Sequence, residues 1–179
     1  MPSFKIRGAN LKDLDVLVEH RRAMFEEMPR MTPEERRGAA NYYREWAKDM
    51  MKQKLFRGYV VETGTGKVAA SGCVWLRQVQ PSRGRPATLI PYVLSMYTHP
   101  DFRRNGLASM IIKEAMAWSK RKGYARITLH ASVVGRKVYS QLGWKRTYEM
   151  EYRFDKPAKS HSIRGGGAPR PSKRARDAT

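Results

Sequence analysis

The sequence predicts one mixed α/β domain in which a central β-sheet carries helices on both faces. Two observations lead to this fold class. Segments with apolar residues at helical spacing alternate along the chain with β-rich segments. The predicted order is strand, helix, helix, three strands, helix, strand, helix and strand, and such interleaving places helices on both sides of a mixed sheet. The length of 179 residues fits a single domain.

A short strand and a capped helix are expected at the N-terminus. Residues 4–7 are predicted to form the strand. Asn10 is a suitable helix N-cap, and Asp13, three residues later, completes an approximate capping box. Apolar residues then recur at helical spacing toward Pro29, so the first helix is expected between Asn10 and Pro29.

A second helix is expected from Thr32 to about Lys54. Thr32 is a capping residue, Pro33 suits the first helical position, and a glutamate follows soon after. One face of this helix is aromatic and rich in methionine; it consists of Tyr42, Tyr43, Trp46, Met50 and Met51. Core packing explains most of these side chains, and one or two of them could instead line an acceptor site.

Three further strands are predicted in the middle of the chain. Residues 56–62 and 67–78 are β-rich and flank Thr-Gly-Thr-Gly at 63–66, which is typical of a β-hairpin. Residues 81–86 are rich in proline and arginine, and we expect them to form an exposed basic loop. The third strand is predicted over residues 89–98 and ends at a His-Pro turn.

The C-terminal half is predicted to contain a helix, a strand, a helix and a strand. The first helix begins near residue 107, has an apolar stripe and ends near Gly123, a good C-cap. Residues 126–129 alternate as a strand. A short helix over 135–142 is closed by a glycine, and residues 145–154 are predicted to form a last, long strand.

The chain is strongly basic, with a formal net charge of +20. Residues 156–179 hold seven basic residues and one acidic residue and almost nothing apolar, so we expect a disordered tail after a folded domain over residues 1–155. The folded domain is basic as well. Such a surface attracts polyanions and speeds the capture of an anionic cofactor, and nucleic acid is an alternative partner.

The sequence favours a cytoplasmic protein without a membrane span. No run of about 18 apolar residues is present, and the first residues lack the apolar core of a secretory signal. Cys73 is the single cysteine, which excludes an internal disulfide. Its apolar, strand-like surroundings predict a packed thiol and not a nucleophile.

The most informative stretch runs from residue 97 to residue 108, where a predicted strand meets a basic glycine turn and a helix. Free N–H groups at a helix start and the helix dipole favour an anion there. Gly106 allows close approach of the backbone, and Arg103 and Arg104 can add charge-assisted hydrogen bonds. The stretch matches neither the P-loop nor the dinucleotide motif. A turn with two surface arginines is the alternative interpretation.

A second motif decides between these interpretations. Residues 138–144, Val-Tyr-Ser-Gln-Leu-Gly-Trp, resemble the L-Y-x-x-x-G-F signature of the GNAT superfamily of N-acetyltransferases, with Val for Leu and Trp for Phe. The Arg-x-x-Gly-x-Ala spacing of residues 103–108 is similar to the pyrophosphate loop of the same family, and the two motifs follow in the family's order. The resemblance covers residues 4–154 and is strongest over 94–144.

The resemblance implies a mostly antiparallel sheet whose fourth and fifth strands splay apart and leave a cleft for acetyl-CoA. It places the pantetheine arm against the backbone of Met96, Tyr97 and Thr98, with an N–H of this segment at the thioester carbonyl. It assigns the pyrophosphate to the loop and helix start that follow, and it implies no metal. These residues are Arg103, Arg104, Asn105, Gly106, Leu107, Ala108 and Ser109.

Tyr139 belongs to the second motif, and the resemblance places it near the thioester sulfur. An amine would attack the thioester directly in a ternary complex, and a backbone donor can stabilise the oxyanion that forms. A phenol with an ordinary pKa near 10 is a suitable proton donor to the leaving thiolate. The acyl group is already activated, so no covalent enzyme intermediate is required. The alternative is that Tyr139 is an aromatic packing residue.

Two positions depart from the family pattern. Ser132 stands seven residues before Tyr139, where the family often has an asparagine that holds the cofactor arm. A hydroxyl can also hydrogen-bond there, although with shorter reach and fewer groups, so Ser132 remains a candidate cofactor contact. Gly135 replaces a usual alanine, which is a mild change.

The general base is left open by the sequence. The acceptor amine must lose a proton before it attacks. Glu26 and Glu27, at the end of the first helix, and His130, after the strand over 126–129, could face the acceptor cleft; water could relay the proton instead. For the two glutamates a solvated surface position is favoured, and His99 is expected to be a turn residue.

The favoured function is transfer of the acetyl group of acetyl-CoA to a primary amine of a small molecule or a peptide. A polyamine suits the basic surface less well, because like charges repel. The alternatives are a basic protein associated with nucleic acid or the ribosome, and an inactive acyl-CoA-binding module; the presence of both motifs favours the enzyme. The acceptor site would belong to the first two helices, where the resemblance is weakest, and a homodimer is compatible with the sequence.

Overall fold

The computed structural model describes residues 3–27, 33–81 and 88–152. The chain falls into two compact units, residues 1–145 and residues 146–179. Some of the sequence-based expectations concern residues outside the described ranges. They are the cap at Thr32, most of the loop over 81–86, and the tail over 156–179.

The centre of the first unit is a five-stranded sheet in which the strands follow their order in the chain. Neighbouring strands run antiparallel up to β4, and β4 and β5 run parallel. This confirms the predicted mixed, mostly antiparallel sheet. The strands are β1 (Phe4–Gly8), β2 (Phe56–Thr63), β3 (Val68–Gln78), β4 (Leu89–Thr98) and β5 (Thr128–Leu129).

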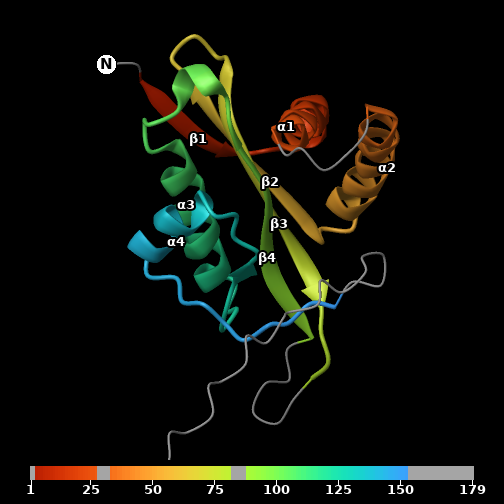
Figure 1. The fold of residues 1–179 in the computed structure, drawn as a ribbon, viewed down its shortest axis with the longest axis vertical. Helices are drawn as coiled ribbons and strands as arrows, with labels where there is room; N and C mark the ends of the chain where they lie inside the picture. Colours follow the sequence, from red (N-terminus) through yellow and green to blue (C-terminus); the bar gives the residue numbers. More distant parts are fainter. Residues whose placement is uncertain (1–2, 28–32, 82–87, 153–179) are drawn as a thin grey trace, which may run out of the picture. The chain divides into compact units, whose positions relative to one another are not determined.

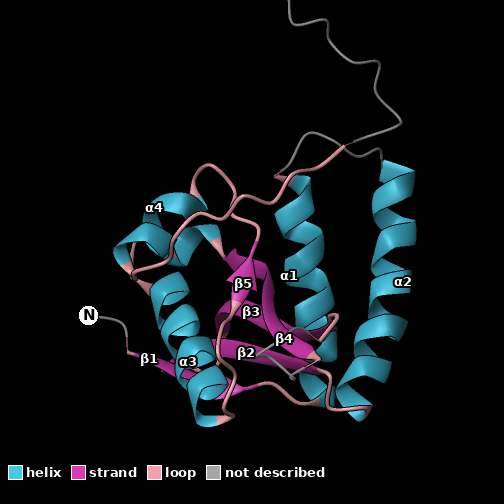
Figure 2. Ribbon diagram, turned by 90° about the horizontal axis from the view of Figure 1, so that it is seen from below, coloured by secondary structure: helices cyan, strands magenta, loops and turns pink. Residues whose placement is uncertain are grey.

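The helices lie on both faces of this sheet, as predicted (Figures 1 and 2). Helices α1 (Leu14–Glu26) and α2 (Pro33–Lys52) cover one face, and α3 (Leu107–Arg121) and α4 (Gly135–Gln141) cover the other. A short 3-10 helix, η1 (Leu11–Asp13), precedes α1. The expected capping box is present, because the Asn10 side chain accepts a hydrogen bond from the Lys12 N–H and the Asp13 carboxylate accepts one from the Asn10 N–H.

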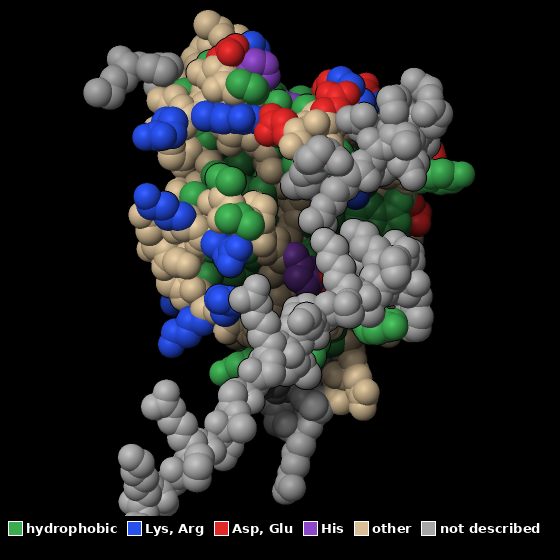
Figure 3. Space-filling view, viewed as in Figure 1, with side chains coloured by type: hydrophobic (Ala, Val, Ile, Leu, Met, Phe, Trp, Pro, Cys, Tyr) green, Lys and Arg blue, Asp and Glu red, His purple; other side chains and the backbone are tan. Residues whose placement is uncertain are grey.

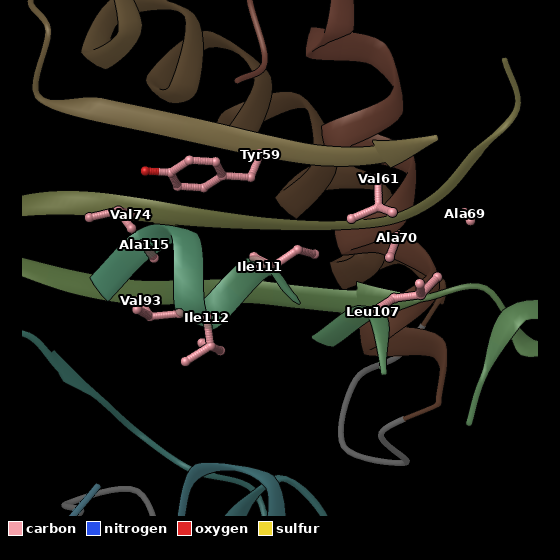
Figure 4. Packing of buried hydrophobic residues seen from close by; sticks show 10 residues of the cluster. All are labelled: Tyr59, Val61, Ala69, Ala70, Val74, Val93, Leu107, Ile111, Ile112 and Ala115. Carbon is pink, nitrogen blue, oxygen red and sulfur yellow. The ribbon is translucent and has the colours of Figure 1, made fainter. Parts of the chain in front are cut away.

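Two apolar cores hold the helices to the sheet. On one face, three side chains of α3 (Leu107, Ile111 and Ile112) pack against strand residues such as Tyr59 and Val93 (Figure 4). On the other face, α1 and α2 pack against a second set of strand residues. Successive residues of β2 alternate between the two cores, because successive side chains of a strand point to opposite faces. Both faces of the sheet are thus covered by helices, and β4, which contributes Val93 to one core and Leu94 to the other, lies between the two helix pairs.

Strand β4 carries a β-bulge near its C-terminal end. Two of its residues, Ser95 and Met96, oppose the single residue Gly72 of β3. Ser95 has φ +52, a left-handed conformation that is uncommon for a non-glycine residue. A bulge bends its strand and re-aims the side chains beside it. The bulge therefore changes the direction of β4 just before the strand meets the loop that leads to α3.

Strands β4 and β5 splay apart beyond a short paired region. The two strands pair only through Tyr92 with Thr128 and Val93 with Leu129. Residues 94–98 of β4 have no strand partner on this side within the described part of the chain. The splay confirms the expectation for the fourth and fifth strands, and it leaves one edge of β4 free to pair with an added extended group.

Two predicted strands differ from the structure. The strand expected over 126–129 begins only at Thr128. The long strand expected over 145–154 is wrong for residues 145–152, which carry no strand, and residues 153–154 lie outside the described ranges. Alternation of apolar residues describes which side chains would share a face, but a strand also needs a hydrogen-bonded neighbour. Tyr148, Met150 and Tyr152, which alternate in this segment, are exposed.

Candidate functional site

The loop between β4 and α3, called the nest below, combines two left-handed residues with a helix start that no side chain caps. It passes through a short 3-10 helix, η2 (Pro100–Phe102), and then through two left-handed residues, Arg104 with φ +67 and Gly106 with φ +74. Gly106 is the N-cap of α3, and no side chain caps the helix. The N–H groups of the first turn therefore lack an intrahelical partner, and an added Cβ at Gly106 would meet no atom within 4 Å. Such a turn can hold an anion on backbone donors.

The side chains of this loop have different roles. The Arg103 guanidinium donates to the Thr98 carbonyl oxygen at 3.0 Å and pairs with the Glu27 carboxylate. Arg104 is exposed, and no described carboxylate lies in ion-pair contact with it. The Asn105 amide donates to two carbonyl oxygens of the loop, at 3.1 and 3.2 Å, and so braces its shape. Leu107 is buried in the α3 core, which leaves only its backbone N–H for a ligand.

The remaining residues predicted for the pyrophosphate site, Ala108 and Ser109, complete the first turn of α3. Like Leu107, they present backbone N–H groups without an intrahelical acceptor. The predicted run from Arg103 to Ser109 thus forms the loop after η2 and the first turn of α3.

The three residues predicted to hold the pantetheine arm lie on that free edge. The Met96 side chain points toward the α3 face, because its Sδ would lie 2.3 Å from a Cβ placed on Gly72. The Tyr97 ring packs against the ring of His20 on the α1 side, with 4.9 Å between the centroids. With the Met96 side chain on the α3 face and the Tyr97 ring packed against His20, these residues offer mainly backbone groups at this edge.

Tyr139 lies in α4, on the side of the sheet that carries α3. It packs against the α3 core and lies near Trp144, with ring centroids 5.9 Å apart. Partial burial raises the pKa of Tyr139 above its ordinary value. The hydroxyl therefore stays protonated across the neutral pH range, as a proton donor must.

Ser132 and Gly135 shape the start of α4. The Ser132 Oγ accepts a hydrogen bond from the Gly135 N–H at 3.0 Å, so the hydroxyl has a structural role and keeps one O–H to donate. A Cβ added to Gly135 would lie 2.9 Å from Cε2 of Tyr139 and 3.1 Å from the Ser132 oxygen. The absence of a Cβ at Gly135 therefore leaves room for the Tyr139 ring in the position it has here.

The carboxylates considered as general bases are engaged in ion pairs. Glu26 pairs with Arg22 on the surface of α1, and Glu27 pairs with Arg103. His130 forms a hydrogen bond with the Tyr92 hydroxyl. His99 is a turn residue as expected, since its Nδ1 accepts from the Asp101 N–H and caps η2. In the described residues no group of three or more His, Cys, Asp or Glu side chains could hold a metal ion.

His20 is a buried polar residue that the sequence analysis did not select. Its Nδ1 lies 2.9 Å from the Ser71 hydroxyl, beside Tyr97 of β4. Burial lowers the pKa of His20 to about 4, so the imidazole is neutral at pH 7. The signal in the sequence was its place three residues after Leu17, on the buried stripe of α1. Its partner, 51 residues away, could not be read from local spacing.

Acid should destabilise the fold through His20. Its folded pKa of about 4 lies below the unfolded value of 6.5, so the unfolded chain binds more protons and stability falls as the pH drops from 6.5 to 4. The loss attributable to this group is about 3 kcal/mol. Urea unfolding of the wild type and His20→Gln at several pH values measures it. A variant with the same slope between pH 6.5 and 4 as the wild type would contradict the assignment.

Cys73 is a packed thiol, as predicted. It is buried, and burial raises its pKa to about 12. The Tyr43 hydroxyl lies 3.9 Å from its sulfur. A thiol that ionises only at such high pH is a poor nucleophile, so Cys73 belongs to the core between β3 and α2.

The described helices include none with the length and apolar character needed to cross a bilayer.

One protein family and several solved structures are similar to this chain over most of its length. The model of a family described as the acetyltransferase (GNAT) family matches residues 18–144. No curated protein matches the chain at a comparable level of significance. A GCN5-related N-acetyltransferase from Ralstonia eutropha JMP134 is 26% identical, with a TM-score of 0.76, and the match covers 84% of this chain and 98% of that one.

Two further solved structures share the fold at lower identity. A predicted acetyltransferase from Clostridium acetobutylicum, solved with acetyl-CoA, has a TM-score of 0.72 and 23% identity over 84% of this chain and 96% of that one. Glucosamine-6-phosphate N-acetyltransferase from Arabidopsis thaliana has a TM-score of 0.59 and 22% identity over 86% and 99% of the two chains. The nest, the free edge of β4 and Tyr139 all lie within the range that the family model matches.

Proposed function

The chain belongs to the GNAT family of acetyltransferases, and from this premise we propose that it transfers the acetyl group of acetyl-CoA to a primary amine of a small molecule or a peptide. One observation carries the proposal: the edge of β4 that has no strand partner among the described residues leads, through the loop that contains η2, to the uncapped N-terminus of α3. An extended amide-bearing arm and a diphosphate joined to it need these two features in this order. The Clostridium acetobutylicum neighbour, solved with acetyl-CoA, supports the same cosubstrate.

In the proposed complex the backbone of α3 holds the pyrophosphate. The N–H groups from Arg104 to Ser109 donate to the phosphate oxygens, and the arginine side chains add charge. The Arg103 side chain already contacts the Thr98 carbonyl oxygen and the Glu27 carboxylate, so it is positioned before the ligand binds. The backbone of residues 96–98 pairs with the pantetheine arm as an added strand would. Ser132 is a further candidate contact through its free O–H.

The proposed chemistry needs one polarising donor and one acid. A backbone N–H of the β4 edge hydrogen-bonds the thioester oxygen and stabilises the negative charge that develops there. The amine attacks the carbonyl carbon directly, the carbon–sulfur bond breaks, and Tyr139 donates its proton to the departing sulfur. The raised pKa of Tyr139 supports this role, since the phenol remains protonated at neutral pH. In this scheme a water molecule accepts the proton of the amine.

The position of the Tyr139 ring is testable through Gly135. The change Gly135→Ala places a methyl group 2.9 Å from the Tyr139 ring, so the ring must move. We expect turnover to fall at least about tenfold, because a misplaced acid loses much of its effect, while acetyl-CoA affinity changes little. Steady-state kinetics and calorimetry measure the two quantities, and Ser140→Ala on the exposed side of α4 is the control. Unchanged turnover would show that the ring position does not matter.

The proposed function itself is tested by an acetyl-CoA consumption assay. The full chain is incubated with acetyl-CoA and a panel of amines: amino sugars and their phosphates, aminoglycosides, amino acids and peptides. Thiol release that depends on one class of amine, with the acetylated product identified by mass spectrometry, would support the proposal. Binding of acetyl-CoA without transfer to any amine would favour an acyl-CoA-binding module instead.

Association with nucleic acid is a second candidate function, and one observation favours it. Lys and Arg side chains gather on the side of the molecule where Figure 1 places α3 and α4 (Figure 3). Residues 101–145 contain ten lysines and arginines against two acidic residues. Binding to duplex DNA or RNA through this face should weaken steeply as salt is added. A gel-shift titration with duplex DNA or RNA at several salt concentrations tests this function, and absence of binding at low salt would exclude it.

A further inference from the structure

Arg21 is a partly buried cation at the junction of α1, α2 and β4. Its guanidinium carbon lies 4.4 Å from the ring centroid of Tyr43 in α2 and 4.7 Å from that of Phe25 in α1. One of its terminal nitrogens donates to the Ser95 hydroxyl of β4 at 3.0 Å. The guanidinium thus contacts two aromatic rings and donates a hydrogen bond to the bulge residue of β4.

This cation has no carboxylate partner among the described residues. Several other described arginines are paired; they are Arg7, Arg22, Arg44, Arg103 and Arg121. A guanidinium carries five N–H donors, and the Ser95 hydroxyl is the only hydrogen-bond acceptor that Arg21 reaches in the described part of the chain. Burial without an anion disfavours the charged form and lowers the pKa of Arg21. A buried charge of this kind gains most from an anionic partner.

The position of Arg21 relates it to the acceptor side of the proposed reaction. Ser95 lies beside Met96 at the bulge, where the proposed thioester-binding edge of β4 begins. Met96 points to the α3 face, whereas Ser95 contacts Arg21 of α1 on the opposite face. An amine that approaches the thioester from the α1 and α2 side would therefore pass close to the guanidinium.

We propose that Arg21 binds an anionic group, a carboxylate or a phosphate, of the amine acceptor; this inference rests on the proposed acetyl transfer. The planar fork of a guanidinium matches the paired oxygens of either group. Contacts with two aromatic rings and with Ser95 already position the side chain, which reduces the conformational entropy that is lost on binding. An acidic acceptor also suits a chain with a net charge of +20, because the field of the protein speeds its capture.

Matched pairs of acceptors test this proposal. The carboxylate arm compares β-alanine with its amide, and the phosphate arm compares glucosamine 6-phosphate with glucosamine. We expect the wild type to prefer the anionic member of at least one pair by about tenfold or more in kcat/KM, and Arg21→Gln to lower kcat/KM for that member about 10- to 100-fold. The arm that shows the preference identifies the anion. Arg21→Lys keeps the charge and loses the planar fork. Its kcat/KM for the anionic member should therefore lie between the values of the wild type and of Arg21→Gln.

Controls separate substrate binding from a structural role. Arg44→Gln removes a paired surface charge on α2 and should leave the preference unchanged. If Arg21 only braces the bulge, Arg21→Gln will lower kcat/KM equally for both members of each pair, and that result would overturn the proposal. Circular dichroism checks folding. Should Arg21→Gln unfold the domain, Arg21→Met, which keeps an apolar side chain of similar length, is assayed in its place.

The failure of this proposal is distinguishable from failure of the proposed function. Transfer to neutral and anionic amines with equal efficiency, unaffected by Arg21→Gln, would refute the anion site and leave acetyl transfer standing. Absence of transfer to every amine would refute the proposed function. In that case calorimetry can still decide whether Arg21 binds the anion. The affinities of the wild type and of Arg21→Gln for β-alanine and for glucosamine 6-phosphate are measured in the presence of coenzyme A. Equal affinities of the two proteins would overturn the anion site.

Discussion

Replacing Gly106 with glutamate is expected to raise the Kd for acetyl-CoA at least about 100-fold. Gly106 has φ +74 and lies at the start of α3, where an added Cβ would meet no atom within 4 Å. A carboxylate there would repel the pyrophosphate and compete for the free N–H groups. Losing two charge-assisted hydrogen bonds, each contributing about 1.5–3 kcal/mol, corresponds to a loss of that size or more. Calorimetry with acetyl-CoA measures it.

Two matched variants separate charge from backbone strain at this site. Gly106→Gln has the same length without the charge, so the difference between the Gln and Glu variants reports repulsion. Gly66→Glu adds the same carboxylate and the same left-handed strain at the turn between β2 and β3, where φ is +80 and space is equally open. It should leave acetyl-CoA affinity unchanged. An unaltered affinity in Gly106→Glu would show that the cosubstrate does not use this nest.

The second large effect is expected from Tyr139→Phe. Loss of the hydroxyl removes the proposed acid and keeps the ring that packs against the α3 core. General acid catalysis contributes about 100- to 10,000-fold, so kcat should fall within that range while acetyl-CoA affinity stays close to that of the wild type. Single-turnover kinetics on a good acceptor and calorimetry with coenzyme A measure the two quantities.

The pH dependence gives an independent check on Tyr139. Burial raises its pKa, so the phenol remains a proton donor until the pH exceeds the ordinary tyrosine value of about 10. The wild type should therefore show no loss of activity from this group between pH 7 and pH 9. Tyr148→Phe, at a fully exposed position, is the control and should retain full activity. Full activity of Tyr139→Phe would assign proton donation to water or to another group.

The elements that the sequence predicted well are those set by neighbouring residues. The capping box of Asn10 and Asp13 formed as expected, and so did the hairpin closed by Gly66. In both cases the deciding hydrogen bonds join residues a few positions apart, so the sequence of one turn contains the needed information. The predicted strand over 145–154 failed for residues 145–152, because a strand depends on a partner that lies elsewhere in the chain.

The sequence by itself determined the order of the elements up to α4 and the turn before α3, since each depends on residues that are close together in the chain. The candidate role of Tyr139 came from the resemblance of a short motif to a family signature. Only the tertiary structure decided the long-range contacts: His20 with Ser71, Arg21 with Ser95, and Glu27 with Arg103, which are 51, 74 and 76 residues apart. The physical reason is the sheet. Strand register and the bulge at Ser95 fix which side chains of β3 and β4 face α1, and no local spacing encodes that register.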